Sequence, residues 1–356
     1  MTDAAKKVKV GIIFGGSSSE KEVSLEGGRN VFQKIDTSKY DIFAIFMDSK
    51  HRIWKIPEFL LLQNTTSDIE RLLATKGERI FYEELKSQID FAFIIGHGKF
   101  MEDGCLQGLL ELQKIPYNGP GILGSALGSE KYIQRKILDN AGIKTPKHLA
   151  LFEDEWRERP EIAARRIEDY LGFPVVVKPS REGCSTAIGI VAKAEDLPQA
   201  FSAAFHWDRR ILVEEKITGM EITISVLGNR ASRIALPITE TPWSKNLGYL
   251  TLQDKFLPGG AEMITPARLS LELTARAQEI AIKVCDELNL IGYPRIDMFV
   301  KEDGEIVVLE PNTLPGITPS TMVFHQAAEV GMNPADFLDK IIALGIEAHA
   351  KKIGPL

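Results

Sequence analysis

The chain has 356 residues, more than one compact core usually holds, which favours two or three domains. Its 43 Lys and Arg against 49 Asp and Glu give a net charge of −6, which excludes a nucleic-acid partner recognised by overall basicity. Hydrophobic residues make up 44% of the chain, as in ordinary globular proteins, but the longest purely apolar run, at 42–47, is far too short to cross a membrane.

The cysteines and the N-terminal segment indicate the cellular compartment in which the protein is expected. Cys105, Cys184 and Cys285 lie far apart and form no CxxC pair, so the sequence predicts neither a disulfide framework nor a zinc site. The first residues run directly into an apolar strand and lack the apolar core of a signal peptide. We therefore expect a cytoplasmic protein with no membrane partner.

Strand and helix patterns alternate along the first third of the chain. Apolar runs at 8–14, 40–47 and 90–95 predict buried strands, and residues 20–35 predict a helix. This alternation predicts an α/β fold that begins with a doubly wound parallel sheet. Such sheets bind ligands at the carboxyl ends of their strands, where the glycines at 15–16 and on either side of His97 fall.

The rest of the chain predicts two further units. A helix at 129–141 is followed by short strands at 174–178 and 211–215, and then by strands at 221–227 and 233–236. A stretch at 237–266, rich in proline and glycine, precedes a long amphipathic helix at 269–288 and a hairpin of strands at 295–300 and 306–310. We expect three domains, at 1–120, 121–214 and 215–356.

The hairpin carries the most informative polar residues. Arg295 and Asp297 are two apart on one strand, and Glu310 and Asn312 are two apart at the end of the other. Because strand side chains alternate with a period of two, each pair shares one face. Two carboxylates and an amide oxygen suit Mg²⁺, which prefers hard oxygen ligands completed by substrate phosphates. The alternative is a surface salt bridge between Arg295 and an acid.

Two other segments have residues that suit a nucleotide. Lys178 ends an apolar strand and leads into a loop of small residues, a pattern typical of phosphate contact although the P-loop order is absent. Glu214 and Lys216 share a strand face and Glu221 follows a glycine, so that segment could read a nucleobase edge and hold ribose hydroxyls. A solvated loop and an exposed charged strand are the respective alternatives.

The N-terminal motif has a simpler alternative interpretation. In GGSSSEKEVS, Glu20 begins a helix behind serine capping candidates, which requires no ligand. The loop cannot be written as GxGxxG, which argues against a dinucleotide-binding oxidoreductase. His97 is often structural in such a position, but the glycines on either side of it indicate close approach by another group.

Six motifs in order resemble the D-alanine–D-alanine ligases of the ATP-grasp superfamily. They are GGSSSEKEVS, HGKFMEDGCLQG, SREGCS, EKITGMEIT, RIDMF and LEPNTLPGIT, and the resemblance runs from about residue 8 to about residue 345. It implies three α/β domains with ATP between the central and C-terminal ones, a homodimer, and ATP-dependent joining of two D-alanines through an acyl phosphate for peptidoglycan synthesis.

The resemblance also implies roles for residues at the nucleotide end. Those expected to contact phosphates are Lys131, Lys178 and, from a mobile loop, Lys255. Those expected to line the adenine pocket are Glu214, Glu215, Lys216 and Ile217, with Glu221 on the ribose. Those expected to hold two Mg²⁺ or Mn²⁺ ions are Asp297, Glu310 and Asn312.

At the amino-acid end, the resemblance implies that Glu20 holds the ammonium group of the first D-alanine and that His97 lies near its carboxylate. Arg295 and the backbone of Gly316 would face the reacting carboxyl group. Ser320 and Thr321 correspond to the region that grips the carboxylate of the second substrate, where the family usually has serine in place of Thr321.

Two departures from the family pattern put the second substrate in question. Cys184 stands where the first serine of SREGSS is usual, beside the candidate substrate-binding Ser185, and Phe256 stands where a tyrosine commonly follows the loop lysine. A thiol donates weakly and phenylalanine has no hydroxyl, so a loop-closing network of hydrogen bonds with Glu20 would be weakened. Cys184 is alternatively a small substitute for serine without a chemical role.

These departures leave several functions open. D-lactate or D-serine could replace the second D-alanine, or the chain could be another ATP-grasp carboxylate–amine ligase. A nucleotide-binding regulatory module that has lost catalysis is a rival from another class, and the intact set of Arg295, Asp297, Glu310 and Asn312 argues against it.

Overall fold

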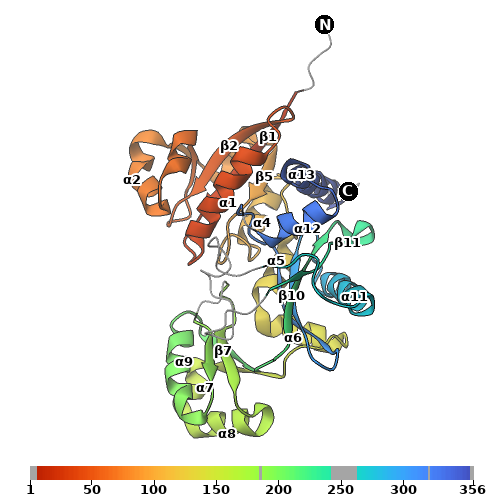
Figure 1. Cartoon of the computed structure of the whole chain (residues 1–356). Coiled ribbons are helices and arrows are strands. Elements are labelled where there is room, and N and C mark those ends of the chain that lie inside the picture. The colour runs from red at the N-terminus through yellow and green to blue at the C-terminus, as the bar shows by residue number, and fades with distance from the viewer. Residues whose placement is uncertain (1–5, 184–186, 242–262, 320, 353–356) are drawn as a thin grey trace.

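The computed structural model describes residues 6–183, 187–241, 263–319 and 321–352 (Figure 1). Five of the candidate site residues therefore lie outside the described residues: Cys184, Ser185, Lys255, Phe256 and Ser320. Most of the proline- and glycine-rich stretch at 237–266 also lies outside them. Within the described part of the chain, every helix is too short or too polar to span a bilayer.

The first sheet has the strand order β4-β3-β2-β1-β5. Its strands are β1 (Val8–Gly15), β2 (Tyr40–Met47), β3 (Ile53–Ile56), β4 (Glu78–Ile80) and β5 (Phe91–Ile94). β1 runs parallel to both β2 and β5, which confirms the predicted parallel core, whereas β3 and β4 extend one edge in antiparallel fashion. The helices of this part are α1 (Lys21–Lys34), α2 (Thr66–Lys76), α3 (Leu85–Gln88), α4 (Cys105–Leu112) and α5 (Ile122–Ser129).

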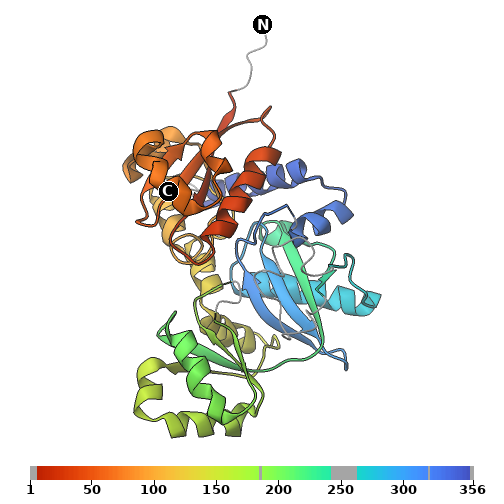
Figure 2. The same ribbon diagram turned by 60° about the vertical axis from the view of Figure 1, so that its left-hand side comes forward.

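The second sheet is antiparallel and has the order β6-β9-β7-β8. Its strands are β6 (His148–Phe152), β7 (Val175–Pro179), β8 (Gly189–Val191) and β9 (Arg210–Glu215), and α6 (Lys131–Asn140) leads into it. Helices α7 (Glu153–Glu158), α8 (Pro160–Leu171) and α9 (Leu197–Phe205) lie together at the lower end of the molecule (Figures 1 and 2). Ile167 and Phe201 from these helices pack against Val177 of β7 in a separate core.

The third sheet contains the predicted hairpin. Its strands are β10 (Met220–Leu227), β11 (Ile234–Ala235), β12 (Thr239–Glu240), β13 (Arg295–Val300) and β14 (Ile306–Asn312). Ile296 and Met298 of β13 face one side of the sheet, where they pack in a core with Ala281 and Val284 of α11 (Leu271–Glu287). Period-two alternation therefore turns Arg295 and Asp297 to the opposite face.

The last two helices return to the first sheet. These are α12 (Met322–Glu329) and α13 (Pro334–Lys352), and α13 lies beside β5 in Figure 1. Phe337 and Ile341 of α13 belong to the same buried core as Phe91 and Ile94 of β5. The first and third sheets thereby approach one another around a shared core, and the polar face of the hairpin lies close to the carboxyl ends of β1 and β5.

Candidate functional site

The carboxylate of Asp297 is the centre of the polar face of the hairpin. Across the strands, Arg295 is opposite Asn312 and Asp297 is opposite Glu310. Arg295 donates to both oxygens of Asp297 through Nε and Nη2, each at 2.8 Å, and Asn312 Nδ2 donates at 3.0 Å. Thr223 Oγ1 of the neighbouring β10 donates at 2.6 Å. The prediction that the hairpin gathers these side chains on one face is confirmed.

A β-bulge makes this arrangement possible. Asp297 is opposite Glu310, but the next residue, Met298, is opposite Val308, so Leu309 is an extra residue in β14. Without it, the regular register would place Leu309 opposite Asp297 and turn Glu310 to the apolar face. Bulges re-aim side chains in this way beside functional sites.

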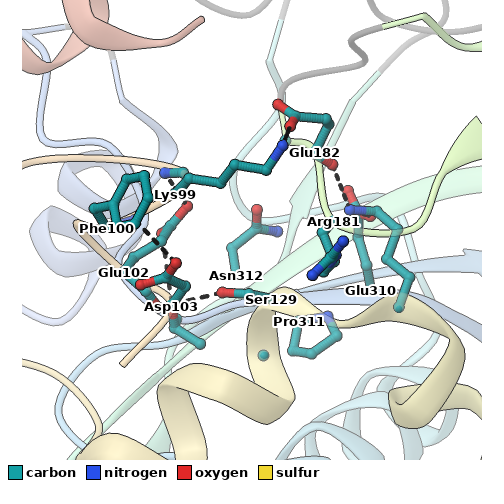
Figure 3. Close-up of a pocket in the computed structure, with 15 residues that line it drawn as sticks. Lys99, Phe100, Glu102, Asp103, Ser129, Arg181, Glu182, Glu310, Pro311 and Asn312 are labelled. Carbon is teal, nitrogen blue, oxygen red and sulfur yellow. Dashed lines mark hydrogen bonds and ion pairs between the residues drawn. The ribbon is translucent and has the colours of Figure 1, made fainter. Parts of the chain in front are cut away.

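A cavity of about 250 Å³ lies in front of Glu310 and Asn312 (Figure 3). Its other walls come from the loop after β5, the start of α6 and the loop after β7, and the side chains from these segments include Lys99, Glu102, Lys131 and Arg181. Lys99 reaches across the opening to Glu182, with 2.6 Å between Nζ and Oε1. Lys131 Nζ donates to the backbone oxygen of Glu182 at 2.7 Å and lies 3.5 Å from Glu310 Oε2.

A smaller cavity of about 50 Å³ adjoins the first and holds the predicted amino-acid end. It is lined by candidate residues from four separate segments of the chain, which are Glu20, His97, Arg295, Gly316 and Thr321. Glu102, Gly183, Glu310 and Asn312 line both cavities, so the two spaces share walls. The smaller cavity is therefore lined by two of the metal candidates, Glu310 and Asn312, together with the amino-acid candidates, whereas Asp297 lines neither cavity.

Buried polar groups mark this smaller cavity. Glu20 and His97 are almost fully buried, and among the described residues no group makes a hydrogen bond to Nε2 of His97. Burial lowers the pKa of His97, which keeps the ring neutral, although the nearby Glu20 carboxylate acts in the opposite direction. Thr321 Oγ1 donates to the backbone oxygen of Gly316 at 2.6 Å, which fixes the turn beside Arg295.

Glu102 belongs to the motif HGKFMEDGCLQG, which the sequence places with Glu20 and His97 at the substrate end, and it lines both cavities. Burial, followed by repulsion from the Glu20 carboxylate, raises its pKa to about 8. The backbone N–H of Gly98 donates to Oε1 at 2.8 Å. The Glu-Asp-Gly turn after a glycine-flanked histidine is the signal in the sequence for this residue.

At the nucleotide end, Lys178 and Glu214 are brought together. Lys178 Nζ lies 2.6 Å from Glu214 Oε2, and Arg135 Nε lies 2.6 Å from Glu214 Oε1. Burial alone would raise the pKa of Glu214, but the two cations outweigh it and lower the pKa to about 2. Burial and the like charge of Arg135 lower the pKa of Lys178, against the attraction of Glu214. Sequence reasoning missed Arg135.

The remaining nucleotide candidates follow β9. Glu215 ends this strand and accepts a hydrogen bond from the backbone N–H of Lys147 at 2.8 Å. Lys216 and Ile217 come next and are partly buried. Glu221 lies on β10, two residues before Thr223, and therefore on the face of the sheet that carries Asp297.

The donor atoms of the hairpin fit Mg²⁺. Among the described residues, no three His, Cys, Asp or Glu side chains cluster as a metal site. The hairpin instead offers the carboxylate of Glu310 and the amide oxygen of Asn312 at the cavity wall. Both oxygens of Asp297 already accept hydrogen bonds, so Asp297 could join the set only by exchanging some of them. This hard oxygen set is incomplete by itself, as expected where substrate phosphates and water complete the coordination.

Known proteins share both halves of this architecture. The family models described as D-ala D-ala ligase N-terminus and C-terminus match residues 9–120 and 137–343. A D-alanine--D-alanine ligase of Carboxydothermus hydrogenoformans is 37% identical and covers 97% of this chain and 100% of its own. The VanG D-Ala:D-Ser ligase of Enterococcus faecalis has a TM-score of 0.82 at 32% identity, covering 96% and 100%. The D-alanine--D-alanine ligase of Bacillus anthracis complexed with ATP has a TM-score of 0.76 at 30% identity, covering 97% and 99%. The chain therefore belongs to the D-alanine–D-alanine ligase family of ATP-grasp enzymes.

Proposed function

We propose that this protein joins two D-alanine molecules in a reaction that requires ATP and Mg²⁺ and gives D-alanyl-D-alanine, ADP and phosphate. The observation that supports this proposal best is the mixed lining of the smaller cavity. Groups suited to an amino acid, Glu20 and His97, share one space with groups suited to a metal–triphosphate complex, Glu310 and Asn312.

The first D-alanine would lie in the smaller cavity. Glu20 is a buried acceptor for its ammonium group, and Nε2 of His97, which has no hydrogen-bond partner among the described residues, would lie near its carboxylate. Arg295 lines the same space while its guanidinium remains fixed by Asp297. A bidentate pair of this kind holds the cation in one orientation, which is the positioning that phosphoryl transfer to a carboxylate requires.

The triphosphate would lie in the larger cavity, with the adenine beyond it near Glu214, Glu215, Lys216 and Ile217 and the ribose near Glu221. Lys131, Lys178 and Lys255 would contact phosphates. Asp297, Glu310 and Asn312 would hold two Mg²⁺ or Mn²⁺ ions, which when bound offset the negative charge of the triphosphate.

The chemistry then proceeds in two steps. A carboxylate oxygen of the first D-alanine attacks the γ-phosphorus of ATP, and ADP leaves. The amine of the second D-alanine attacks the acyl carbon, loses a proton, and phosphate leaves. Arg295 and the backbone N–H of Gly316 would stabilise the tetrahedral oxyanion, and Ser320 and Thr321 would hold the carboxylate of the second substrate. Residues 237–266 would exclude water, because water hydrolyses an acyl phosphate.

D-serine or D-lactate is the alternative second substrate. It is favoured by the likeness to the VanG D-Ala:D-Ser ligase and by Cys184 and Phe256, which depart from the family pattern. The deciding experiment measures phosphate release with D-alanine alone and then with D-serine or D-lactate added, with mass spectrometry of the products. Release with D-alanine alone and a D-alanyl-D-alanine product support the proposal; release only when a second compound is added favours the alternative.

We also propose that the protein is a cytoplasmic homodimer that serves peptidoglycan synthesis, with domain boundaries near residues 120 and 214. An exposed apolar face supports the dimer. Leu112 at the end of α4 is 83% exposed and Leu123 in α5 is 60% exposed, with Ile122 beside it. Helices α4 and α5 lie against each other, and an apolar patch spread over both would suit a protein–protein contact.

A further inference from the structure

Arg135 is a fully buried arginine that the proposed chemistry does not use. It lies on the inner face of α6 with no exposed surface. An ion pair joins its Nε to Glu214 Oε1 at 2.6 Å. Among the described residues, neither Nη1 nor Nη2 has a hydrogen-bond partner. A buried guanidinium group with two unpartnered nitrogens is unfavourable, so its presence calls for an explanation.

The charges around Glu214 do not balance. Two cations, Arg135 and Lys178, contact one carboxylate, and all three side chains are buried. Lys178 alone would neutralise Glu214, so a simple structural ion pair has no need of Arg135. Replacing a buried ionic group with an apolar one is often neutral or stabilising, which makes a purely structural role a weak explanation. The excess positive charge is of the sign that attracts a phosphate.

Lys178 and Arg135 differ in how easily each can move away from Glu214. Lys178 is a single ammonium group on a flexible stem at the end of β7, at the start of the loop that lines the larger cavity with Arg181, Glu182 and Gly183. Arg135 is enclosed on the inner face of a helix. If Lys178 turned to a phosphate in the absence of Arg135, Glu214 would remain as a buried carboxylate without a counter-ion, which is strongly unfavourable.

We infer that Arg135 is a positioning residue for the nucleotide: it remains paired with Glu214 so that Lys178 is released to a phosphate group. This inference rests on the proposed function, because it requires ATP to bind beside Lys178. The low pKa of Glu214, about 2, agrees with it, since the carboxylate stays ionised at neutral pH. Arg135 acts through Glu214 and touches no reacting atom.

The test compares equilibrium binding of ATP and of adenosine, measured by calorimetry in the full-length protein. Arg135→Met should lower ATP affinity about tenfold or more and adenosine affinity by less than about threefold, because only ATP needs Lys178. Arg135→Lys keeps the charge and should hold the ATP-to-adenosine affinity ratio within about threefold of wild type. Arg233→Met is the matched control, because Arg233 is another largely buried arginine, paired with Asp286 on α11. It should leave the ratio unchanged.

A second background tests whether Arg135 acts through Glu214. With Glu214→Gln no carboxylate holds Lys178, so adding Arg135→Met should change the ratio by less than about threefold. A tenfold loss in both backgrounds, or equal loss of ATP and adenosine affinity, overturns the inference. If Arg135→Met alone does not fold, Arg135→Lys and the double variant decide: a tenfold fall in the ratio in either one contradicts it. Wild-type protein that fails to bind ATP contradicts the proposed function itself.

Discussion

Replacing Asp297 with asparagine should lower both stability and activity, because this carboxylate pairs with the buried Arg295 and is also a proposed Mg²⁺ ligand. It is buried and accepts two hydrogen bonds from Arg295, one from Thr223 and one from Asn312. Asparagine keeps the shape but removes the charge. Arg295 would then lose the buried carboxylate that accepts two of its hydrogen bonds.

The size of the stability loss follows from this geometry. The Arg295 and Asp297 side chains are 11% and 9% exposed, so water screens the pair only slightly. Removing one partner of a buried pair costs about 3–5 kcal/mol, and we expect the lower end because the amide oxygen can still accept one hydrogen bond. A loss of about 3 kcal/mol should lower the midpoint of urea unfolding clearly without a change in its slope.

Glu310→Gln is the matched control. Its side chain is 27% exposed and lies 3.5 Å from Lys131 Nζ, against 9% and 2.8 Å for Asp297 beside Arg295, so the loss of its charge should cost clearly less stability. Both variants should lose Mg²⁺-dependent phosphate release in the presence of D-alanine, whereas only Asp297→Asn should unfold at lower urea. Equal stability losses in the two variants would show that the Arg295–Asp297 pair does not stabilise the fold, and full turnover in either variant would remove its carboxylate from the proposed metal site.

Three further predictions concern pH, substrate affinity and assembly. The folded protein keeps a proton on Glu102 up to about pH 8, whereas the unfolded chain loses it near pH 4.5. Between these values the unfolded state binds fewer protons, so the free energy of unfolding of the wild type falls as the pH rises. Glu102→Gln removes this loss of up to about 1.4 kcal/mol per pH unit, so the variant should gain stability over wild type between pH 5 and pH 8 in urea titrations; a constant difference contradicts this. A Cβ atom at Gly183 would lie 2.4 Å from Glu20 Oε2. Gly183→Ala should therefore raise the KM for D-alanine about tenfold, equivalent to about 1.4 kcal/mol, while the KM for ATP stays constant. An unchanged KM for D-alanine in steady-state kinetics would count against the role of Glu20. Leu112→Glu should convert a dimer to a monomer in sedimentation equilibrium, and a wild-type monomer would exclude the proposed assembly.

Elements with strong apolar periodicity were predictable from the sequence. The strand Tyr40–Met47 has the predicted bounds. The helix predicted at 20–35 is α1, which begins one residue later and ends one residue earlier. Long runs of buried residues determine such elements locally, so no tertiary information is needed. The short edge strands β3 and β4 were not predicted, because four and three residues are too few to establish a pattern.

The hairpin shows where local pattern is insufficient. Period-two spacing correctly paired Arg295 with Asp297 and Glu310 with Asn312, but it did not reveal that a bulge is needed to put both pairs on one face. The cross-strand register sets Leu309 apart as the extra residue, and register depends on contacts between strands. The shared face was predicted from the sequence, and the β-bulge that produces it was not.

The ion pair of Arg135 could not be predicted from the sequence at all. The helix that carries Arg135 was predicted, yet an arginine on the inner face gives no local signal of its partner. That partner, Glu214, lies 79 residues further along the chain, and the contact exists only once α6 packs beside β9. Buried ion pairs between distant segments are therefore beyond sequence patterns alone.

The proposed function requires that the hairpin site bring the γ-phosphate of ATP to the carboxylate of an amino acid. An isotope experiment tests this with D-alanine labelled with ¹⁸O in its carboxyl group, together with ATP and Mg²⁺, and mass analysis of the released phosphate. Attack by the carboxylate predicts phosphate that carries one labelled oxygen, together with the labelled dipeptide. Phosphate without label would contradict the account, because the carboxylate would not have been phosphorylated.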